Sequence, residues 1–389
     1  MDLRLFASAA ARERLLLWKD KKSKTDTIKN KRKYPLVFVI LKQTTGTDTL
    51  AAFAPRGTDP NGIGPWCKSS QSVCPRGREE NTMNEIKLKA YAKINLSIDV
   101  TGKRPDGYHD VIMVLQQIDL YDTVTVRSHG DIAGTPVRIS SDSAEMPTGQ
   151  DNIVWKAVHL MKEYCPDKAR ESVEIHIEKN IPMAAGLAGG SADAAAVLHG
   201  LNVLWKCDLS LSQLMEIGVK LGADVPFCIM GQAAKDNALG MSKEEVSTCA
   251  LAQGIGEILT PLPPLSASVV LSKPPIPVST AEIYKSLDLN AIARRPDTQS
   301  LIKGLQRQDF SAVRAAMYNV LQEVSVRKYP IIAELIQLLG SIAPEAKVMM
   351  SGSGPTVFAI TLDKDQALSI YNEIQLKHSN TFLVTTSLS

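Results

Sequence analysis

The segment that most constrains the fold is a run of small residues at positions 181–193, IPMAAGLAGGSAD. A strand is predicted before it over residues 172–179, and an apolar helix is predicted after it over residues 191–205. Small side chains let a ligand approach the backbone closely, and the start of a helix offers free N–H groups at the positive end of its dipole. This combination favours a site that binds phosphate groups.

The loop matches neither of two well-known nucleotide-binding patterns. No Gly-Lys-Ser/Thr follows the glycines, as a P-loop requires. The G-x-G-x-x-G spacing of dinucleotide-binding folds is absent, and no acidic residue can be assigned to a ribose. A glycine- and alanine-rich loop by itself is a tight turn more often than a nucleotide site. Asp193 by itself would be explained as a complement to the helix dipole.

A second informative segment is residues 90–96, AYAKINL, where apolar and polar residues alternate as in a strand. The alternation places Lys93 and Asn95 on one face and Ile94 on the core face. A lysine at such a position is usually a charge on an edge strand. Residues 104–109, RPDGYH, follow this strand.

Two further features complete the candidate site. Residues 350–356, MSGSGPT, form a second glycine loop between two predicted strands and could cover the first loop, although alone they would be a hairpin-like turn. Asp224 lies between a predicted helix over residues 211–221 and an apolar stretch that is interpreted as a strand. A single aspartate in a loop is usually a turn residue or a helix cap.

The remaining elements mix strands with helices. Further strands are predicted over residues 111–119, 122–128, 269–272, 347–350, 356–360 and 382–385. Further helices are predicted over residues 152–164, 280–287, 310–325, 330–340 and 364–376. This order predicts an α+β fold in two domains, with a boundary near residues 260–266, where three prolines cluster.

Each of these motifs is only weak evidence alone. Together, the residues in them and their order along the chain resemble the 4-diphosphocytidyl-2-C-methyl-D-erythritol kinases, a family of the GHMP kinase superfamily. The resemblance runs from about residue 84 onward and includes three family motifs in the family's order. The stretch from residue 92 to residue 109 distinguishes this family from the mevalonate, homoserine and galactose kinases. The resemblance implies a two-domain GHMP kinase fold, with a ribosomal-protein-S5-like N-terminal domain and a ferredoxin-like C-terminal domain.

The family's reaction is implied as well: ATP-dependent phosphorylation of the 2-hydroxyl of 4-diphosphocytidyl-2-C-methyl-D-erythritol in the non-mevalonate isoprenoid pathway. The resemblance makes Lys93 and Asp224 the catalytic pair, in which Asp224 takes the hydroxyl proton and Lys93 keeps Asp224 ionised. Ser191 is the implied protein ligand of Mg²⁺. The ATP phosphates would be bound by Pro182, Met183, Ala184, Ala185, Gly186, Leu187, Ala188, Gly189, Gly190, Ser191 and Ala192.

The cytidine end of the substrate is assigned by the same resemblance. Tyr108 and Tyr284 would sandwich the cytosine ring, His109 would hydrogen-bond its polar edge, and Asn95 would orient the substrate near Lys93. The partner is therefore a small molecule, with no nucleic acid and no membrane. Monomer and homodimer both stay open. The expected location is the cytoplasm, with a plastid-like organelle as the alternative.

Two parts of the chain depart from the family. The expected division is a basic extension over residues 1–82, an N-terminal kinase domain over 83–262 and a C-terminal domain over 263–389. The N-terminal domain carries an insert at residues 234–249, which is expected to interrupt a strand close behind Asp224. If the insert loops out, activity survives. If it breaks the strand, stability suffers. A GHMP-like binding protein inactivated by the insert is one alternative. Another GHMP small-molecule kinase is the remaining alternative.

The charge of the extension and the spacing of the cysteines allow two further predictions. Residues 1–82 hold 16 Lys and Arg residues against 8 Asp and Glu residues, a balance typical of a nucleic-acid tether or of a solvated extension, of which the solvated extension is favoured. None of the six cysteines forms a C-x-x-C pair, and their scatter predicts free thiols. They are Cys67, Cys74, Cys165, Cys207, Cys228 and Cys249.

Overall fold

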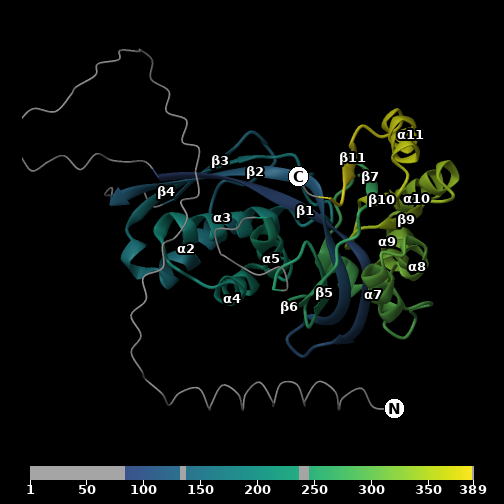
Figure 1. The fold of residues 1–389 in the computed structure, drawn as a ribbon, viewed down its shortest axis with the longest axis horizontal. Helices are drawn as coiled ribbons and strands as arrows, with labels where there is room; N and C mark the ends of the chain where they lie inside the picture. Colours follow the sequence, from purple (N-terminus) through teal and green to yellow (C-terminus); the bar gives the residue numbers. More distant parts are fainter. Residues whose placement is uncertain (1–83, 132–136, 236–244, 388–389) are drawn as a thin grey trace, which may run out of the picture. The chain divides into compact units, whose positions relative to one another are not determined.

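The structure is a computed structural model that describes residues 84–131, 137–235 and 245–387 (Figure 1). The predicted extension, residues 1–82, lies outside the described residues, as do residues 236–244 of the insert. The chain from residue 84 onward belongs to one compact unit. Within it the strands form two sheets, one of seven strands and one of four.

The larger sheet is built around the long antiparallel pair β1 (Asn84–Lys103) and β2 (His109–Asp131). β2 pairs with β5 through its first part and with β4 through its second part. The two separate strands predicted over 111–119 and 122–128 are therefore one, because bulges let the pair bend without breaking. The other strands of this sheet are β3 (Val137–Ser141), β4 (Glu171–Glu178), β5 (Cys249–Gln253), β6 (Ile258–Leu262) and β8 (Tyr318–Asn319).

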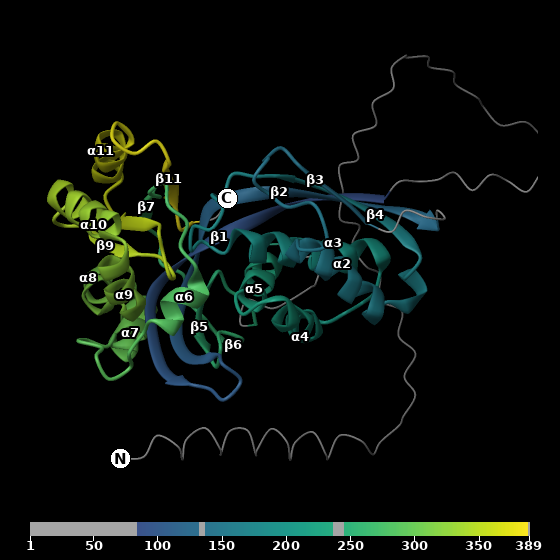
Figure 2. The same ribbon diagram turned by 180° about the vertical axis from the view of Figure 1, so that it is seen from behind.

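Four helices lie together on one face of this sheet, as both ribbon views show (Figures 1 and 2). They are α2 (Ile153–Tyr164), α3 (Gly189–Trp205), α4 (Leu211–Leu221) and α5 (Val225–Lys235). α3 is apolar around most of its circumference because it is buried between the sheet and its neighbours. Gly200 allows the close approach, since a Cβ there would lie 3.1 Å from Leu88 Cδ1 of β1.

The segment after Asp224 is helix α5, so the strand predicted there is wrong. When every residue of a run is apolar, the pattern cannot distinguish the two-residue period of a strand from the helical period of about 3.6 residues. This run is apolar because it is buried on nearly all sides. Pro226 lies in the first turn, where a helix tolerates proline. The insert does not interrupt a strand, because residues 234 and 235 end α5 and β5 begins only at Cys249.

The smaller sheet has the strand order β11-β7-β10-β9 and is antiparallel throughout. Its strands are β7 (Ser268–Ser272), β9 (Lys347–Met350), β10 (Val357–Thr361) and β11 (Thr381–Thr385). The accompanying helices are α6 (Thr280–Lys285), α7 (Thr298–Arg307), α8 (Phe310–Ala316), α9 (Val320–Lys328), α10 (Pro330–Ile342) and α11 (Lys364–Gln375). No helix in the described part of the chain is long and apolar enough to cross a membrane.

The single helix predicted over residues 310–325 is divided into α8, β8 and α9. Asn319 explains the break, because its side chain accepts a hydrogen bond from Leu321 N (3.0 Å) and so caps α9. β8 pairs in parallel with β1, Ser97 opposite Tyr318, so the chain returns from the smaller sheet to the larger one. The strands change sheets between β6 and β7, and the domain boundary at 262/263 stays a prediction.

The prediction of free thiols is wrong for one pair of cysteines. Cys165, which ends α2, and Cys207, which follows α3, form a disulfide with their Cα atoms 6.0 Å apart. The two cysteines are 42 residues apart in the sequence, so their spacing did not predict the bond. They come together because the ends of two packed helices meet in the folded chain. Cys228 and Cys249 are free and buried, and burial raises the pKa of both thiols. Cys67 and Cys74 lie outside the described residues.

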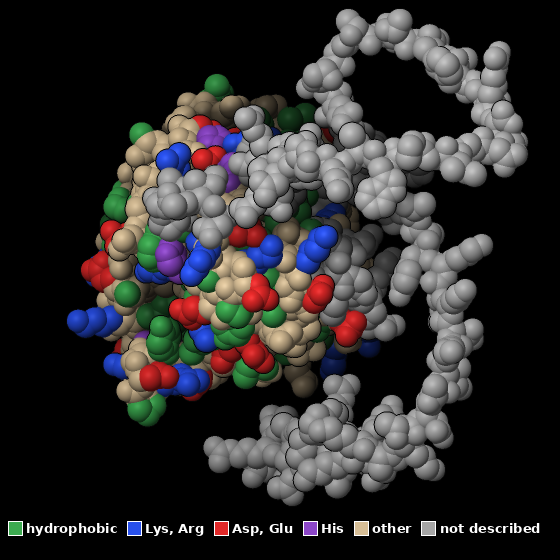
Figure 3. Space-filling view, turned by 90° about the vertical axis from the view of Figure 1, so that its left-hand side faces the viewer, with side chains coloured by type: hydrophobic (Ala, Val, Ile, Leu, Met, Phe, Trp, Pro, Cys, Tyr) green, Lys and Arg blue, Asp and Glu red, His purple; other side chains and the backbone are tan. Residues whose placement is uncertain are grey.

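The surface seen in Figure 3 carries acidic and basic side chains that are interspersed among the described residues. A polyanion backbone is bound by a continuous band of Lys and Arg side chains. The part of this face that the structure describes shows no such band.

Candidate active site

A cavity of about 920 Å³ lies where β1, the first glycine loop, the turn before α5, α6 and the second glycine loop meet. Of the predicted site residues, all but Leu187 and Ala192 line it, and those two side chains are buried in the core. The predicted residues in its wall are Lys93, Asn95, Tyr108, His109, Pro182, Met183, Ala184, Ala185, Gly186, Ala188, Gly189, Gly190, Ser191, Asp224 and Tyr284. Residues that are far apart in the sequence thus share one cavity.

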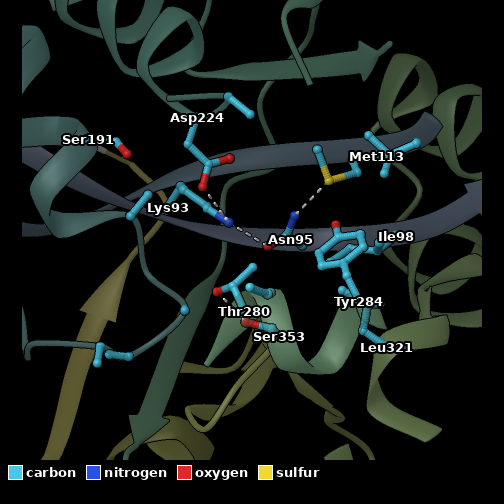
Figure 4. A pocket seen from close by; sticks show the side chains of 18 of the residues that line it. Lys93, Asn95, Ile98, Met113, Ser191, Asp224, Thr280, Tyr284, Leu321 and Ser353 are labelled. Carbon is cyan, nitrogen blue, oxygen red and sulfur yellow. Dashed lines mark hydrogen bonds and ion pairs between the residues drawn. The ribbon is translucent and has the colours of Figure 1, made fainter. Parts of the chain in front are cut away.

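Lys93 is buried in β1 and points toward Asp224 (Figure 4). Its Nζ lies 3.5 Å from Asp224 Oδ2 and donates a hydrogen bond to Asn95 Oδ1 at 2.8 Å. Asn95 in turn faces Met113, with Nδ2 3.6 Å from the thioether sulfur. The period of the strand accounts for the shared face of Lys93 and Asn95. A buried ammonium requires such partners, because an unpaired charge in the interior is strongly unfavourable.

Asp224 lies in the turn that begins α5, where its carbonyl accepts a hydrogen bond from Cys228 N at 3.2 Å. The positive end of the α5 dipole favours a carboxylate at this position. The side chain of Asp224 is 31% exposed, whereas that of Lys93 is 5% exposed. The carboxylate is therefore the part of the ion pair that a molecule in the cavity can reach.

The first glycine loop is shaped by three residues in the left-handed region, Ala184 (φ 49°), Gly186 (φ 73°) and Ala188 (φ 60°). Lys93 N donates to Leu187 O at 3.0 Å, which ties the loop to the strand that carries the ion pair. α3 begins directly afterwards, at Gly189. The backbone of the loop and the N-terminal turn of α3 therefore face the same cavity as Lys93.

The second glycine loop packs directly against the first. Ser351 Oγ donates to Gly186 O at 3.0 Å. A Cβ on Gly186 would lie 2.5 Å from Ser351 O and 2.9 Å from Gly354 O, so the contact requires glycine. α9 fixes this second loop, because Asn319 Nδ2 donates to Gly352 O at 2.8 Å and Ser325 Oγ donates to Ser353 O at 3.0 Å.

The predicted aromatic residues occupy the other part of the cavity wall. The rings of His109 and Tyr284 lie 5.3 Å apart at an interplanar angle of 42°, while Tyr108 is 59% exposed. The structure thus brings His109, rather than Tyr108, against Tyr284. Burial, followed by the neighbouring charge of Lys103, lowers the pKa of His109. Burial, and then Asp224, raises the pKa of Tyr284.

Several residues of the cavity wall were not predicted. Thr280 and Ser353 join the α6 segment to the second loop through a 2.9 Å contact between their hydroxyls. Lys179 lies just before the first loop and pairs with Asp193 of α3, and Met113 contacts Asn95. Ser353 belongs to the second glycine loop, so that motif was a signal for it. The other three have no distinctive sequence pattern.

Comparison with known proteins gives a consistent result. The N-terminal domain pattern of the GHMP kinases matches residues 152–232, and the C-terminal pattern matches residues 301–380. The 4-diphosphocytidyl-2-C-methyl-D-erythritol kinase of Alkaliphilus metalliredigens is 45% identical over 304 residues, which cover 78% of this chain and 97% of that protein. The enzyme of the same name from Clostridioides difficile is 45% identical over 313 residues, with 78% and 96% covered.

Solved structures agree with these sequence matches. A crystal structure of 4-(cytidine 5'-diphospho)-2C-methyl-D-erythritol kinase superposes with a TM-score of 0.61 at 26% identity, covering 77% of this chain and 98% of that one. The homoserine kinase of Cytophaga hutchinsonii superposes with a TM-score of 0.56 at 16% identity, covering 82% and 98%. The second likeness concerns the fold alone.

Proposed function

Since the chain belongs to the 4-diphosphocytidyl-2-C-methyl-D-erythritol kinases of the GHMP superfamily, we propose how its cavity carries out that family's reaction. The reaction uses ATP to phosphorylate the 2-hydroxyl of 4-diphosphocytidyl-2-C-methyl-D-erythritol in the non-mevalonate isoprenoid pathway. The observation that carries the proposal is the Lys93–Asp224 ion pair, which lies between a glycine loop and an aromatic pair in one cavity.

Asp224 acts as the general base. Its partly exposed carboxylate takes the proton of the substrate hydroxyl as the hydroxyl oxygen attacks the γ-phosphorus of ATP. The bond from the γ-phosphorus to the oxygen that bridges it to the β-phosphate breaks, and ADP leaves. Lys93 favours the ionised carboxylate and offsets the negative charge that develops on the attacking oxygen. Asn95 holds the ammonium in place through the 2.8 Å hydrogen bond, so the charge is positioned before the substrate arrives.

The first glycine loop binds ATP through its backbone N–H groups and the N-terminal turn of α3. Phosphoryl transfer depends mainly on positioning and on neutralising charge, and this loop supplies both beside Lys93. The described residues include no cluster of three or more His, Cys, Asp or Glu side chains that could hold a metal. The hydroxyl of Ser191, which lines the cavity, would hold Mg²⁺, because this ion commonly takes one or two protein oxygens and completes its shell with phosphate oxygens and water. Bound Mg²⁺ would neutralise phosphate charge.

The aromatic part of the cavity binds the cytidine end. Tyr284 offers a ring face for stacking, and His109 offers one donor and one acceptor nitrogen to the polar edge of cytosine, since its lowered pKa favours the neutral imidazole. Tyr108, which is exposed beside them, covers the other ring face.

Replacing Tyr284 with leucine is expected to raise the KM for the cytidine substrate about 10-fold, because stacking on an aromatic ring contributes ~1–3 kcal/mol per base. The KM for ATP should change little, since the glycine loop is intact. Steady-state kinetics with each substrate varied in turn measures both. Tyr284→Phe keeps the ring and serves as the control. Equal rises in both KM values for the leucine variant would contradict the assignment.

The reaction itself is tested by a coupled ADP-release assay with ATP and Mg²⁺. The full chain is given 4-diphosphocytidyl-2-C-methyl-D-erythritol, mevalonate or homoserine at equal concentrations. ADP release with the first substrate alone is expected. Turnover of a substrate that lacks cytidine would instead support another GHMP kinase. No turnover by a folded chain would indicate a binding protein without activity.

A further inference from the structure

Three charged side chains are buried together beneath the first glycine loop. Lys179, just after β4, forms ion pairs with Asp122 of β2 and with Asp193 of α3, the latter at 2.8 Å. The side chains of Lys179, Asp122 and Asp193 are 5%, 0% and 4% exposed. The cluster therefore holds two carboxylates and one ammonium in the protein interior, next to the cavity that Lys179 also lines.

The cluster also fixes the backbone that leads into the loop. Asp122 Oδ1 accepts hydrogen bonds from Asn180 N at 2.6 Å and from Ile181 N at 2.8 Å. Gly189, the first residue of α3, packs on Ile181 so closely that a Cβ would lie 3.0 Å from its Cγ2. The chain segments before and after the loop are thus joined twice, through the Lys179–Asp193 ion pair and through this apolar contact.

The backbone conformation of this loop has to be stabilised by its surroundings. Ala184 and Ala188 adopt the left-handed region, which is unfavourable for a residue with a Cβ and persists only where the surroundings hold it. Buried ion pairs are poor sources of net stability, because removing charges from water opposes the attraction between them. A buried cluster with an excess carboxylate therefore calls for a role other than stability.

The carboxylate of Asp193 is held by Lys179 through one of its two oxygens, Oδ2. Within the described residues, Asp193 Oδ1 has no hydrogen-bond partner. For Lys179, burial lowers the pKa, but the two carboxylates outweigh this effect and the pKa is raised, so the ammonium stays charged.

We propose that Asp122, Lys179 and Asp193 are positioning residues, which hold the base of the loop at residues 182–188 closed so that its backbone is set for ATP before ATP binds. A loop that is already ordered in the folded protein loses little conformational entropy when ATP binds. The affinity for ATP is therefore higher than for a loop that must become ordered on binding. This inference rests on the proposed role of the loop in binding ATP.

The test compares Asp193→Ala with Asp193→Asn. Alanine removes one of the two carboxylates that accept from Lys179, the one that ties it to α3, whereas asparagine retains a carbonyl oxygen there. The alanine variant is expected to raise the KM for ATP, and the Kd for ATP measured directly by calorimetry, at least 10-fold. The KM for the cytidine substrate should stay within about twofold. Asparagine should restore most of the affinity for ATP.

A matched control removes an ion pair at the other end of β4. Glu171→Ala breaks the 2.6 Å pair with Lys168 and the hydrogen bond from Ser128, both outside the cavity wall, and is expected to lower the Tm without changing the Kd for ATP. If Asp193→Ala fails to fold, Lys179→Arg provides the same comparison, because arginine keeps the charge but changes the geometry at both carboxylates.

The outcomes separate the two proposals. An unchanged Kd for ATP in folded Asp193→Ala, with a wild type that turns over, would overturn the positioning role alone. A wild type that does not bind ATP would overturn the proposed role of the loop. A loss of affinity for ATP that asparagine rescues would support the inference even if the alcohol substrate were wrong.

Discussion

Replacing Asp224 with asparagine is expected to lower kcat at least 100-fold, or about 2.7 kcal/mol in the activation free energy, because asparagine matches the size of aspartate but cannot take a proton. The KM for ATP should change little, since the carboxylate faces the cavity and the loop is bound to β1 independently through Lys93 N. ADP release at saturating ATP and substrate measures the loss. Lys93→Met should cause a comparable loss, and the double variant should be little worse, because the two side chains act as one unit.

The control for this series is Asp208→Asn. Asp208 is exposed and adopts a φ of 53°, a conformation that asparagine tolerates, so kcat should be unchanged. If Asp224→Asn retained more than about a tenth of the wild-type kcat, the role of Asp224 as general base would be untenable.

Replacing Gly186 with alanine is expected to have the second large effect. The backbone conformation, with φ 73°, by itself costs alanine about 1–2 kcal/mol. The larger obstacle is the added Cβ, which would lie 2.5 Å from the backbone oxygen of Ser351, an atom held by a 2.9 Å hydrogen bond from Gly354 N. The two loops must separate, so the KM for ATP should rise at least 10-fold and the free energy of unfolding should fall by about 1–3 kcal/mol.

Gly340→Ala is the matched control for the glycine series. No atom lies within 4 Å of a Cβ at that position, which is in α10. Alanine is the better helix former by about 1 kcal/mol, so the Tm should rise slightly and the kinetics should not change. Thermal unfolding measures the stability of both variants, and titration with ATP measures their affinity for the nucleotide. A Gly186→Ala enzyme with wild-type affinity for ATP would show that the contact between the loops is not needed.

Local patterns in the sequence predicted those parts of the fold and site that depend on neighbouring residues. The shared face of Lys93 and Asn95 followed from the period of a strand, and the loop before α3 followed from its small residues. The helices α2, α4 and α11 begin within two residues of their predicted starts, because an Asn, Ser or Asp caps each of them.

The features that could not be predicted depend on residues that are far apart in the sequence and meet only in the folded chain. Nothing local marks Lys179 as the partner of Asp122, or Cys165 as the partner of Cys207. The apolar run after Asp224 fits a buried strand as well as a buried helix, and only packing against α3 and α4 decides for α5. The break between α8 and α9 depends on the contact of Asn319 with a loop further along the chain.

The two-residue strand β8 has a consequence for how the protein is made. β1 is synthesised first among the described strands, yet its parallel partner, Tyr318 and Asn319, leaves the ribosome only after all the other strands of the larger sheet. At about 5–20 residues per second, that interval lasts on the order of 10–40 seconds. Through that time the middle of β1 keeps an unpaired edge, the kind of surface that joins strands of other chains. Until residues 318 and 319 pair with it, this edge needs cover from the chain's own helices or from a chaperone.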